Sequence, residues 1–325
     1  MIILGIEGTA WNLSASLVSD DKVLTQASSA YTPTTGGIHP RDAAQHAANN
    51  ITTVIRQAVE STDLRSIDGV AFSQGPGLGP CLRIVGTAAR TLSLRLEVPL
   101  IGVNHCIAHI EVGRWKTNLV DPIVLYVSGA NSQVLSYRQH RYRVLGETLD
   151  IGIGNCLDKF ARAAGLTHPG GPKVEKLAQK SQKYLPMPYV VKGMDFSFSG
   201  IVTAAAQALK SASLEEICYS FQETAFSMLV EVSERALSQM NKSDLLLAGG
   251  VGANTRLQEM LSTMCVQRDA RFCVPTPEFL QDNGAMIAYT GLLMLKHGVH
   301  TPIANSGANP SFRPDEVEVP WIQMH

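Results

Sequence analysis

Leu4-Gly5-Ile6-Glu7-Gly8-Thr9-Ala10 joins an apolar strand to a glycine-rich turn near the start of the chain. The pattern returns at Leu125-Tyr126-Val127-Ser128-Gly129-Ala130-Asn131-Ser132, and again at Leu246-Leu247-Ala248-Gly249-Gly250-Val251-Gly252-Ala253-Asn254. A strand that ends in glycine and hydroxyl residues offers backbone N–H groups and space for a phosphate. One such turn is a weak signal, because most glycine turns only reverse the chain. Three of them, one at the start of each half and one late in the second, predict a nucleotide-binding cleft.

The elements around these turns repeat along the chain. In the first half we expect strands at 2–6, 14–18, 23–28, 70–73 and 100–103, and helices at 41–61 and 80–96. In the second half we expect strands at 123–127, 133–137, 142–147, 244–248 and 271–274, and helices at 154–164, 172–181, 213–237, 254–265 and 282–296. This α/β arrangement resembles actin, the sugar kinases and the heat-shock ATPases, which are built from two ribonuclease-H-like domains. We predict two such domains facing a ligand cleft, one at 1–117 joined by the C-terminal segment 298–325, the other at 118–297.

His105 and His109 lie four residues apart where a strand gives way to a helix. At that spacing two imidazoles share a helix face and can bind one metal ion. The residues between them, Cys106, Ile107 and Ala108, cannot deprotonate a metal-bound water, so the pattern does not favour peptide hydrolysis. A second interpretation, two helix-start histidines satisfied by the backbone or by solvent, is equally consistent with the spacing.

Asp282 begins the motif Asp282-Asn283-Gly284-Ala285-Met286, just before the last long helix. A single Asp at such a position is most often an N-cap. A carboxylate late in the chain could instead complete a metal site begun by the two histidines. The sequence leaves both roles open.

The charge of the chain is nearly balanced, with 27 Lys and Arg residues against 28 Asp and Glu residues, so composition does not indicate nucleic-acid binding. The segment 159–192 departs from this balance, because its single acid is Glu175. Its seven basic residues are Lys159, Arg162, Lys173, Lys176, Lys180, Lys183 and Lys192. A run of one charge usually marks a solvated helix face. The alternative is a binding site for the phosphates of a nucleotide or of RNA.

The six cysteines are scattered and contain no Cys-x-x-Cys pair, which favours free thiols in a reducing compartment. The N-terminal segment reaches Glu7 without a basic region, so it does not have the pattern of a signal peptide. No apolar stretch is long enough to span a bilayer. We expect a cytoplasmic protein that does not associate with membranes.

A longer series of motifs resembles a single family. The motifs are Ile6 to Ala10, Gly36-Gly37-Ile38-His39-Pro40, Ser73 to Pro80, Asn104 to His109, Gly146 to Asp150, Pro169 to Pro172, Gly193 to Gly200 and Asp282 to Ala288. Through them the chain resembles the archaeal and eukaryotic tRNA threonylcarbamoyladenosine synthase, the catalytic subunit of the KEOPS complex, formerly called O-sialoglycoprotein endopeptidase. The similarity runs in register from residue 2 to about Trp321. The sequence Glu7-Gly8-Thr9-Ala10, together with Tyr126, favours this branch over the bacterial one.

The resemblance implies transfer of a threonylcarbamoyl group from threonylcarbamoyl-AMP to the exocyclic amine of adenosine 37, in tRNAs that read codons beginning with A. By matching positions, it implies that His105, His109, Asp282 and Tyr126 hold a metal ion. This ligand set suits iron, with zinc as the second candidate. A Lewis acid is useful here because an aromatic exocyclic amine is a poor nucleophile, so the carbonyl must be activated.

The resemblance also implies an adenine nucleotide, either threonylcarbamoyl-AMP or ATP, in the cleft. The positions that match its binding residues are Tyr126, Val127, Ser128, Gly129, Ala130, Asp158, Gly171, Glu175 and Asn254. The residue that removes the amine proton is not defined by the family pattern, and Glu7 and His46 are our two candidates. Ala130 departs from the pattern, because the family usually has a second glycine there.

The partners implied by the resemblance are tRNA and three KEOPS subunits: a kinase/ATPase subunit, a small dimerising subunit and a further small subunit. A separate enzyme would make the adenylate. The alternative function is an ATP-hydrolysing scaffold or chaperone-like nucleotide switch built on the same cleft, which the near-neutral charge slightly favours. Metal content and tRNA-dependent AMP release distinguish the two. A small-molecule kinase would need an Asp where Glu7 stands and would leave the histidine pair unexplained.

Overall fold

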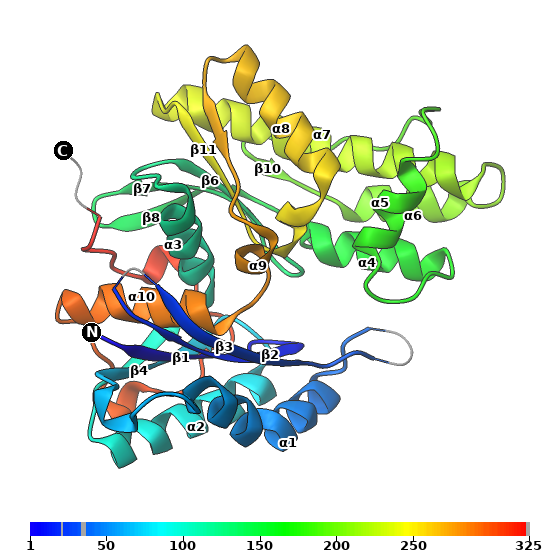
Figure 1. The fold of residues 1–325 in the computed structure, drawn as a ribbon. Coiled ribbons are helices and arrows are strands. Elements are labelled where there is room, and N and C mark those ends of the chain that lie inside the picture. Colours follow the sequence, from blue (N-terminus) through cyan, green and yellow to red (C-terminus); the bar gives the residue numbers. More distant parts are fainter. Residues whose placement is uncertain (21, 34–36, 323–325) are drawn as a thin grey trace.

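Two five-stranded sheets, each with mixed strand directions, form the framework of the protein. The structure is a computed structural model that describes residues 1–20, 22–33 and 37–322. Helices lie outside each sheet and also between the two sheets, so the chain is built in alternating helical and sheet layers (Figure 1). Within the described ranges, no helix is both long enough and apolar enough to cross a membrane.

The first sheet has the strand order β3-β2-β1-β4-β5. Its strands are β1 (Ile3–Glu7), β2 (Asn12–Val18), β3 (Val23–Ala30), β4 (Gly69–Gly75) and β5 (Leu100–Asn104). β1, β2 and β3 form an antiparallel meander, whereas β1, β4 and β5 run parallel. Helices α1 (Pro40–Val59) and α2 (Gly79–Leu96) cover one face and bury Val54 and Val85 against it. Because the parallel strands end at the same edge, Glu7 and Asn104 both lie at that edge.

The second sheet repeats the first. Its strands are β6 (Ile123–Val127), β7 (Ser132–Arg138), β8 (Arg141–Glu147), β11 (Asp244–Ala248) and β12 (Arg271–Cys273). Read from β8, the order is β8-β7-β6-β11-β12, again a three-stranded antiparallel meander followed by two parallel strands. The internal repeat predicted from the sequence is therefore confirmed in strand order and direction.

Two helices lie between the sheets, α3 (His105–Thr117) and α10 (Gly284–Lys296) (Figure 1). α3 follows the first sheet in the sequence but packs on β6 and β11 of the second. α10 comes late in the chain but packs on β1, β2 and β4 of the first. Their buried side chains, among them Ile110 and Ile287, join both lobes in one core. The domain boundaries 1–117 with 298–325, and 118–297, stay a prediction, which did not anticipate that α10 packs on the first sheet.

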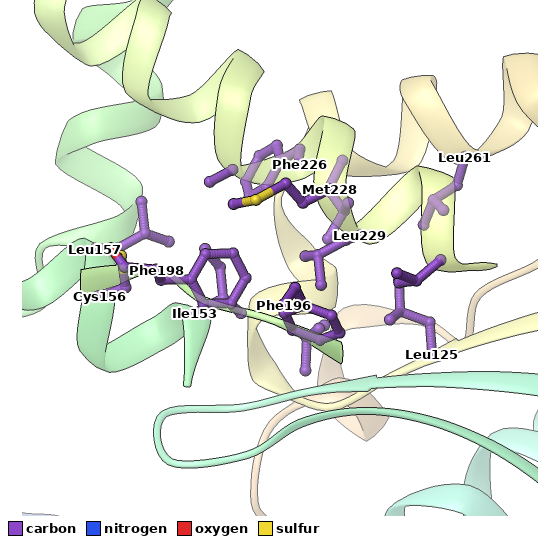
Figure 2. Close-up of a cluster of buried hydrophobic side chains, with 14 of the residues drawn as sticks. Leu125, Ile153, Cys156, Leu157, Phe196, Phe198, Phe226, Met228, Leu229 and Leu261 are labelled. Carbon is purple, nitrogen blue, oxygen red and sulfur yellow. The ribbon is translucent and has the colours of Figure 1, made fainter. Parts of the chain in front are cut away.

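The outer face of the second sheet carries a thick helical layer. Its helices are α4 (Ile153–Ala163), α5 (Gly171–Ala178), α6 (Ser199–Ala208), α7 (Leu214–Met240) and α8 (Thr255–Gln267). Figure 2 shows part of its core, a buried cluster that includes Phe226 and Leu229 of α7 and Leu125 of β6. The hairpin β9 (Val191–Lys192) and β10 (Asp195–Phe196), like α6, was not predicted. Phe196 and Phe198 are fully buried in the core, so tertiary packing defines this segment more than any local pattern does.

The C-terminal segment from 298 to 322 contains two short 3₁₀ turns, at Ile303–Asn305 and Pro314–Glu316, and is otherwise irregular. It contacts both lobes: the N–H of Asn309 donates to the carbonyl of Gln74, and the Tyr137 hydroxyl donates to the carbonyl of Val319. Gly36, in the motif predicted at 36–40, lies outside the described residues.

Candidate functional site

The two histidines lie in the first two turns of α3, directly after strand β5. The N-cap is Asn104, whose Oδ1 accepts hydrogen bonds from the backbone N–H groups of Cys106 and Ile107. This cap starts the helix at His105, and the spacing of four residues then puts His109 on the same face. Their ring centroids are 4.7 Å apart with the planes nearly perpendicular. Both side chains are buried.

Asp282 completes the pair from the other end of the chain. It lies between the short helix α9 (Pro277–Leu280) and α10, and the N-cap of α10 is Asn283, not Asp282. The N-cap role considered for Asp282 is therefore wrong, and its carboxylate is free to face the histidines. Oδ1 of Asp282 lies 3.4 Å from Nε2 of His105 and 3.1 Å from Nε2 of His109. One ligand atom from each of the three residues lies within 4.8 Å of the others, a geometry that can hold a metal ion.

Tyr126 is the fourth member of the cluster. It lies near the end of β6, fully buried, with its ring centroid 5.5 Å from that of His109. Its hydroxyl and Nδ1 of His109 have no hydrogen-bond partner among the described residues. A buried polar atom without a partner is costly unless a ligand, ion or water completes it. The donor set of two imidazoles, a carboxylate and an orphaned phenol therefore fits a transition metal.

Glu7 contacts Nδ1 of His105, the ring nitrogen that does not face Asp282. Its side chain is fully buried at the end of β1. Oε1 accepts a hydrogen bond from the N–H of Thr9 at 2.7 Å, and Oε2 lies 3.1 Å from Nδ1 of His105. The contact leaves Nε2 of His105 directed at Asp282. A carboxylate that holds the far nitrogen of a metal-binding histidine is a common arrangement in metal sites.

Burial and neighbouring charges shift the pKa values of these side chains in different directions. Burial lowers the pKa of His105, but the carboxylates of Glu7 and Asp282 together raise it well above its usual range. Burial lowers the pKa of His109, and its bond to Asp282 does not offset this. Burial raises the pKa of Asp282, but the two histidines lower it by more, so that it falls below its usual range. Burial raises the pKa of Tyr126 well above its usual range. Metal binding to these atoms would therefore displace protons.

The second glycine turn joins β6 to β7 and is hydrogen-bonded to the start of α4. The carbonyls of Ser128 and Gly129 accept hydrogen bonds from the N–H groups of Gly154 and Asn155, at 3.1 and 2.9 Å. Ala130 is not among the residues with positive φ, so its methyl group introduces no left-handed backbone strain. The N-terminus of α4 is therefore fixed to the turn.

The third glycine turn packs against the end of β6. Gly249 has a φ of 88°, and a β-carbon there would lie 2.4 Å from the carbonyl oxygen of Val127. Only glycine allows this approach. The turns after β6 and β11 are therefore adjacent, beside Tyr126.

The remaining residues matched to nucleotide binding form a group around α4, α5 and α8. Asp158 accepts a hydrogen bond from the N–H of Gly170 at 2.7 Å. Oε1 of Glu175 accepts from both the N–H and the hydroxyl of Thr255, at 2.8 and 2.5 Å. Asn254 caps α8. No hydrogen bond within the described residues joins Asp158, Glu175 or Asn254 to the histidine pair.

A surface pocket of about 460 Å³ lies beside this group, between α5, α7 and α8. Glu175, Gln222 and Thr255 contribute to its lining. Asn254 is tied to it, because its Nδ2 donates to Oε1 of Gln222 at 3.1 Å. Gly171 is the first residue of α5 and is partly buried, but it does not line the pocket.

His46 lies on α1, and its side chain forms hydrogen bonds with Ser29 and Asn50, not with the residues around the histidine pair. Its Nε2 lies 2.9 Å from the hydroxyl of Ser29, and its ring contacts Tyr31. Among the described residues, no hydrogen bond joins it to Glu7 or the α3 histidines. Its role as a proton acceptor stays a prediction.

Two contributions to the site were not predicted. Asn104, as the cap of α3, could have been recognised from its position just before the histidine pair. The contact between Glu7 and His105 joins residues 98 positions apart, and no local pattern reveals it.

Comparison with known proteins gives a consistent family. A family model described as tRNA N6-adenosine threonylcarbamoyltransferase matches residues 22–289. The chain is 64% identical to the tRNA N6-adenosine threonylcarbamoyltransferase of Methanococcoides burtonii, over 98% of this chain and 97% of that protein. It is 60% identical to the protein of the same name from Archaeoglobus fulgidus, over 99% and 100% of the two chains. A probable bifunctional tRNA threonylcarbamoyladenosine biosynthesis protein of Methanosarcina mazei is 62% identical, and the match covers 60% of it.

Solved structures show similarity in fold. T. kodakarensis HypF aligns with a TM-score of 0.65 at 16% identity, over 92% of this chain and 48% of that chain. Component A of the Acidaminococcus fermentans (R)-2-hydroxyglutaryl-CoA dehydratase aligns with a TM-score of 0.57 at 11% identity, over 89% and 97% of the two chains. Together with the repeated sheets, these similarities confirm the predicted class of two ribonuclease-H-like domains in an actin-like ATPase fold.

Proposed function

Because the chain belongs to the tRNA N6-adenosine threonylcarbamoyltransferase family, we propose that it transfers a threonylcarbamoyl group from threonylcarbamoyl-AMP to adenosine 37 of tRNA. The tRNAs are those that read codons beginning with A. The observation that carries the proposal is the convergence of His105, His109 and Asp282 beside the unpartnered hydroxyl of Tyr126. No general base lies between the histidines, which agrees with acyl transfer to an amine and not with hydrolysis.

The reaction forms one bond and breaks one. The exocyclic nitrogen of adenosine attacks the carbamoyl carbon, the bond from that carbon to the phosphate oxygen breaks, and AMP leaves with the electron pair. The amine loses one proton, which passes to the departing AMP phosphate or to solvent. The backbone N–H groups of Gly129 and Ala130, which have no acceptor among the described residues, are suited to stabilise the leaving phosphate, because the turn is fixed in place before the reaction.

His105, His109, Asp282 and Tyr126 would hold the metal, with iron as the first candidate and zinc as the second. Bound there, the metal supplies Lewis acidity for the carbamoyl carbonyl and orients the acyl group. The chain itself contributes the buried, water-poor surroundings of these side chains. Desolvation of this kind strengthens the electrostatic interactions within a site.

Glu7 acts in this proposal as a positioning residue for His105. Both of its carboxylate oxygens already accept hydrogen bonds or contacts from Thr9 and His105. A base must reach the proton that it removes, and these contacts occupy the atoms that would do so. Retention of the proton on Nδ1 of His105 would keep Nε2 available as a ligand.

The adenylate would lie along the turn Tyr126 to Ala130, with its nucleoside toward Asp158, Gly171, Glu175 and Asn254. The turn supplies the backbone N–H groups, and the second group supplies carboxylate and amide acceptors for hydroxyl groups. The pocket beside Glu175 and Gln222 is consistent with a nucleoside on this side of the fold.

The proposal includes a KEOPS-type assembly with a kinase/ATPase subunit, a small dimerising subunit and a further small subunit, working in the cytoplasm. The cysteines support a reducing compartment, because all six are free thiols. Relatives described as bifunctional support a functional connection to a second activity.

Acceptor specificity tests this function. The purified chain with its partner subunits is incubated with threonylcarbamoyl-AMP labelled in the threonyl group and an unmodified tRNA. The control is the same tRNA with guanosine at position 37. Label should enter the adenosine tRNA, with one AMP released per group transferred, and should not enter the guanosine tRNA. Equal labelling of both tRNAs, or AMP release independent of tRNA, would contradict the proposal.

A further inference from the structure

Four exposed basic residues lie on or just after α4 and α5, two helices in contact with each other, and are called the basic face below. Lys159 and Arg162 belong to α4, Lys176 to α5, and Lys180 follows two residues after α5 ends. All four side chains are exposed, and none forms an ion pair with a residue in the described part of the chain. Lys159 and Arg162 are three residues apart, and Lys176 and Lys180 are four apart. At these spacings the two residues of each pair lie on the same side of their segment.

The sign of the charge on this face is the informative property. The opposite sides of the two helices are buried, with Leu157 and Phe160 of α4 and Val174 of α5 in the core. Amphipathic helices must expose polar residues, but they need not expose one sign only. The two acids on these helices, Asp158 and Glu175, are bound instead to Gly170 and Thr255. Asp158 also lies 3.3 Å from Nδ1 of His168, and neither acid forms an ion pair with the four basic residues in the described part of the chain.

The basic face begins at the site and leads away from it. Gly154, at the start of α4, is hydrogen-bonded to the carbonyl of Ser128 in the second glycine turn. A helix rises about 1.5 Å per residue, so Lys159 and Arg162 lie roughly 8 and 12 Å along α4 from that bond. Arg162 also reaches Gly37 of the first lobe. Its Nη2 is so close that a β-carbon placed on Gly37 would lie 3.4 Å from it.

We infer that this face binds the phosphate backbone of the RNA that presents the acceptor adenosine. The inference rests on the proposed function. A base that enters a site from a single-stranded loop brings the phosphates on either side of it to the surface around that site. The donor adenylate has one phosphate, at the turn, and does not account for cations displaced along the helix. Because the net charge of the chain is −1, attraction to RNA requires a local basic face of this kind.

Two matched triple variants test the inference. The first is Lys159→Gln, Arg162→Gln and Lys176→Gln. The control is Arg56→Gln, Arg65→Gln and Arg95→Gln, three exposed basic residues of the first lobe that also form no ion pair with a described residue. Both triples lower the net charge by three, so they separate position from overall charge. The dissociation constant of unmodified tRNA is measured for the full chain between 50 and 200 mM salt.

We expect the first triple to reduce the slope of log affinity against log salt by about 2 to 3, since each lost phosphate contact contributes about 0.7 to 0.9. The control should keep the slope of the unaltered chain. In the transfer reaction, the first triple should raise the KM for tRNA and leave the KM for the adenylate unchanged. Equal slopes in the two triples, or no tRNA binding by the unaltered chain at 50 mM salt, would overturn the inference. Label transfer by the unaltered chain reports on the proposed function separately.

Discussion

Replacement of Glu7 separates a positioning role from a proton-accepting role. In Glu7→Gln the side chain keeps its size but loses one of its two acceptor oxygens. If the amide oxygen faces Nδ1–H of His105, the amide NH₂ group faces the N–H of Thr9, which is also a donor. If the amide is reversed, Nδ1 must accept, and the imidazole proton moves to Nε2, the atom directed at Asp282. Each orientation has a cost.

The expected loss follows from these contacts. Removal of a hydrogen-bond partner of a metal-binding histidine lowers metal affinity about 10- to 100-fold. This corresponds to about 1.4 to 2.8 kcal/mol, at about 1.4 kcal/mol per factor of ten. An unsatisfied N–H at Thr9 would additionally lower the free energy of unfolding by about 1 to 3 kcal/mol.

The assay is competition between the metal-free chain and a chelator of known affinity, for zinc as a diamagnetic ion and then for iron. ¹H–¹⁵N spectra of the zinc-loaded chain report whether Nδ1 of His105 carries a proton. We expect weaker zinc binding in Glu7→Gln and a loss or shift of the Nδ1–H signal. A variant with the metal affinity and Nδ1–H signal of the unaltered chain, but without transfer, would refute the positioning role and identify Glu7 as the proton acceptor.

Three further outcomes follow from the structure. His109→Ala should abolish transfer and metal retention while its circular dichroism spectrum stays that of the unaltered metal-free chain; full activity would contradict the metal assignment. Burial raises the pKa of Asp150, but hydrogen bonds that its carboxylate accepts from the hydroxyl of Ser197 and from the N–H groups of Phe198 and Ser199 lower it below its usual range. A carboxylate with a lowered pKa stabilises the fold above about pH 4. Asp150→Asn should therefore lower the free energy of unfolding by about 1 kcal/mol at pH 7, a value reduced because Asp150 is exposed. This difference between the variant and the unaltered chain should vanish as the pH falls below about 4. A difference independent of pH would contradict that explanation. Phe226→Ala, at a fully buried position, should lower the free energy of unfolding by about 3 to 5 kcal/mol in urea denaturation, whereas Val266→Ala, 76% exposed, should change it by less than about 0.5.

Strands and glycine turns were predictable because their signals are local. The turn after β11 requires glycine at position 249, and its sequence shows that requirement directly. α7 was expected from the cap at Ser213, and the structure shows the helix at Leu214–Met240 with the Ser213 hydroxyl accepting from the N–H of Glu216. Local chemistry and the hydrophobic period agreed in these elements.

Long-range packing determined what could not be predicted. Asp282 was assigned either a cap or a ligand role from sequence, and only the structure shows that Asn283 caps α10 while Asp282 faces the histidines. The contact of Glu7 with His105 depends on β1 and β5 ending at the same edge of a sheet. α10 packs on the sheet of the other half, and no period within its own sequence specifies which sheet it covers.

The most direct test measures metal content and transfer on the same samples. Label from carbon-14 threonylcarbamoyl-AMP into unmodified tRNA is counted for the chain with its partner subunits, before chelation, after it, and after iron or zinc is returned. The account predicts that transfer follows the metal bound, up to one ion per chain, and that Asp282→Asn loses both together. Full transfer by metal-free chain would contradict the role of the site. ATP hydrolysis without any labelled tRNA would instead favour a nucleotide switch.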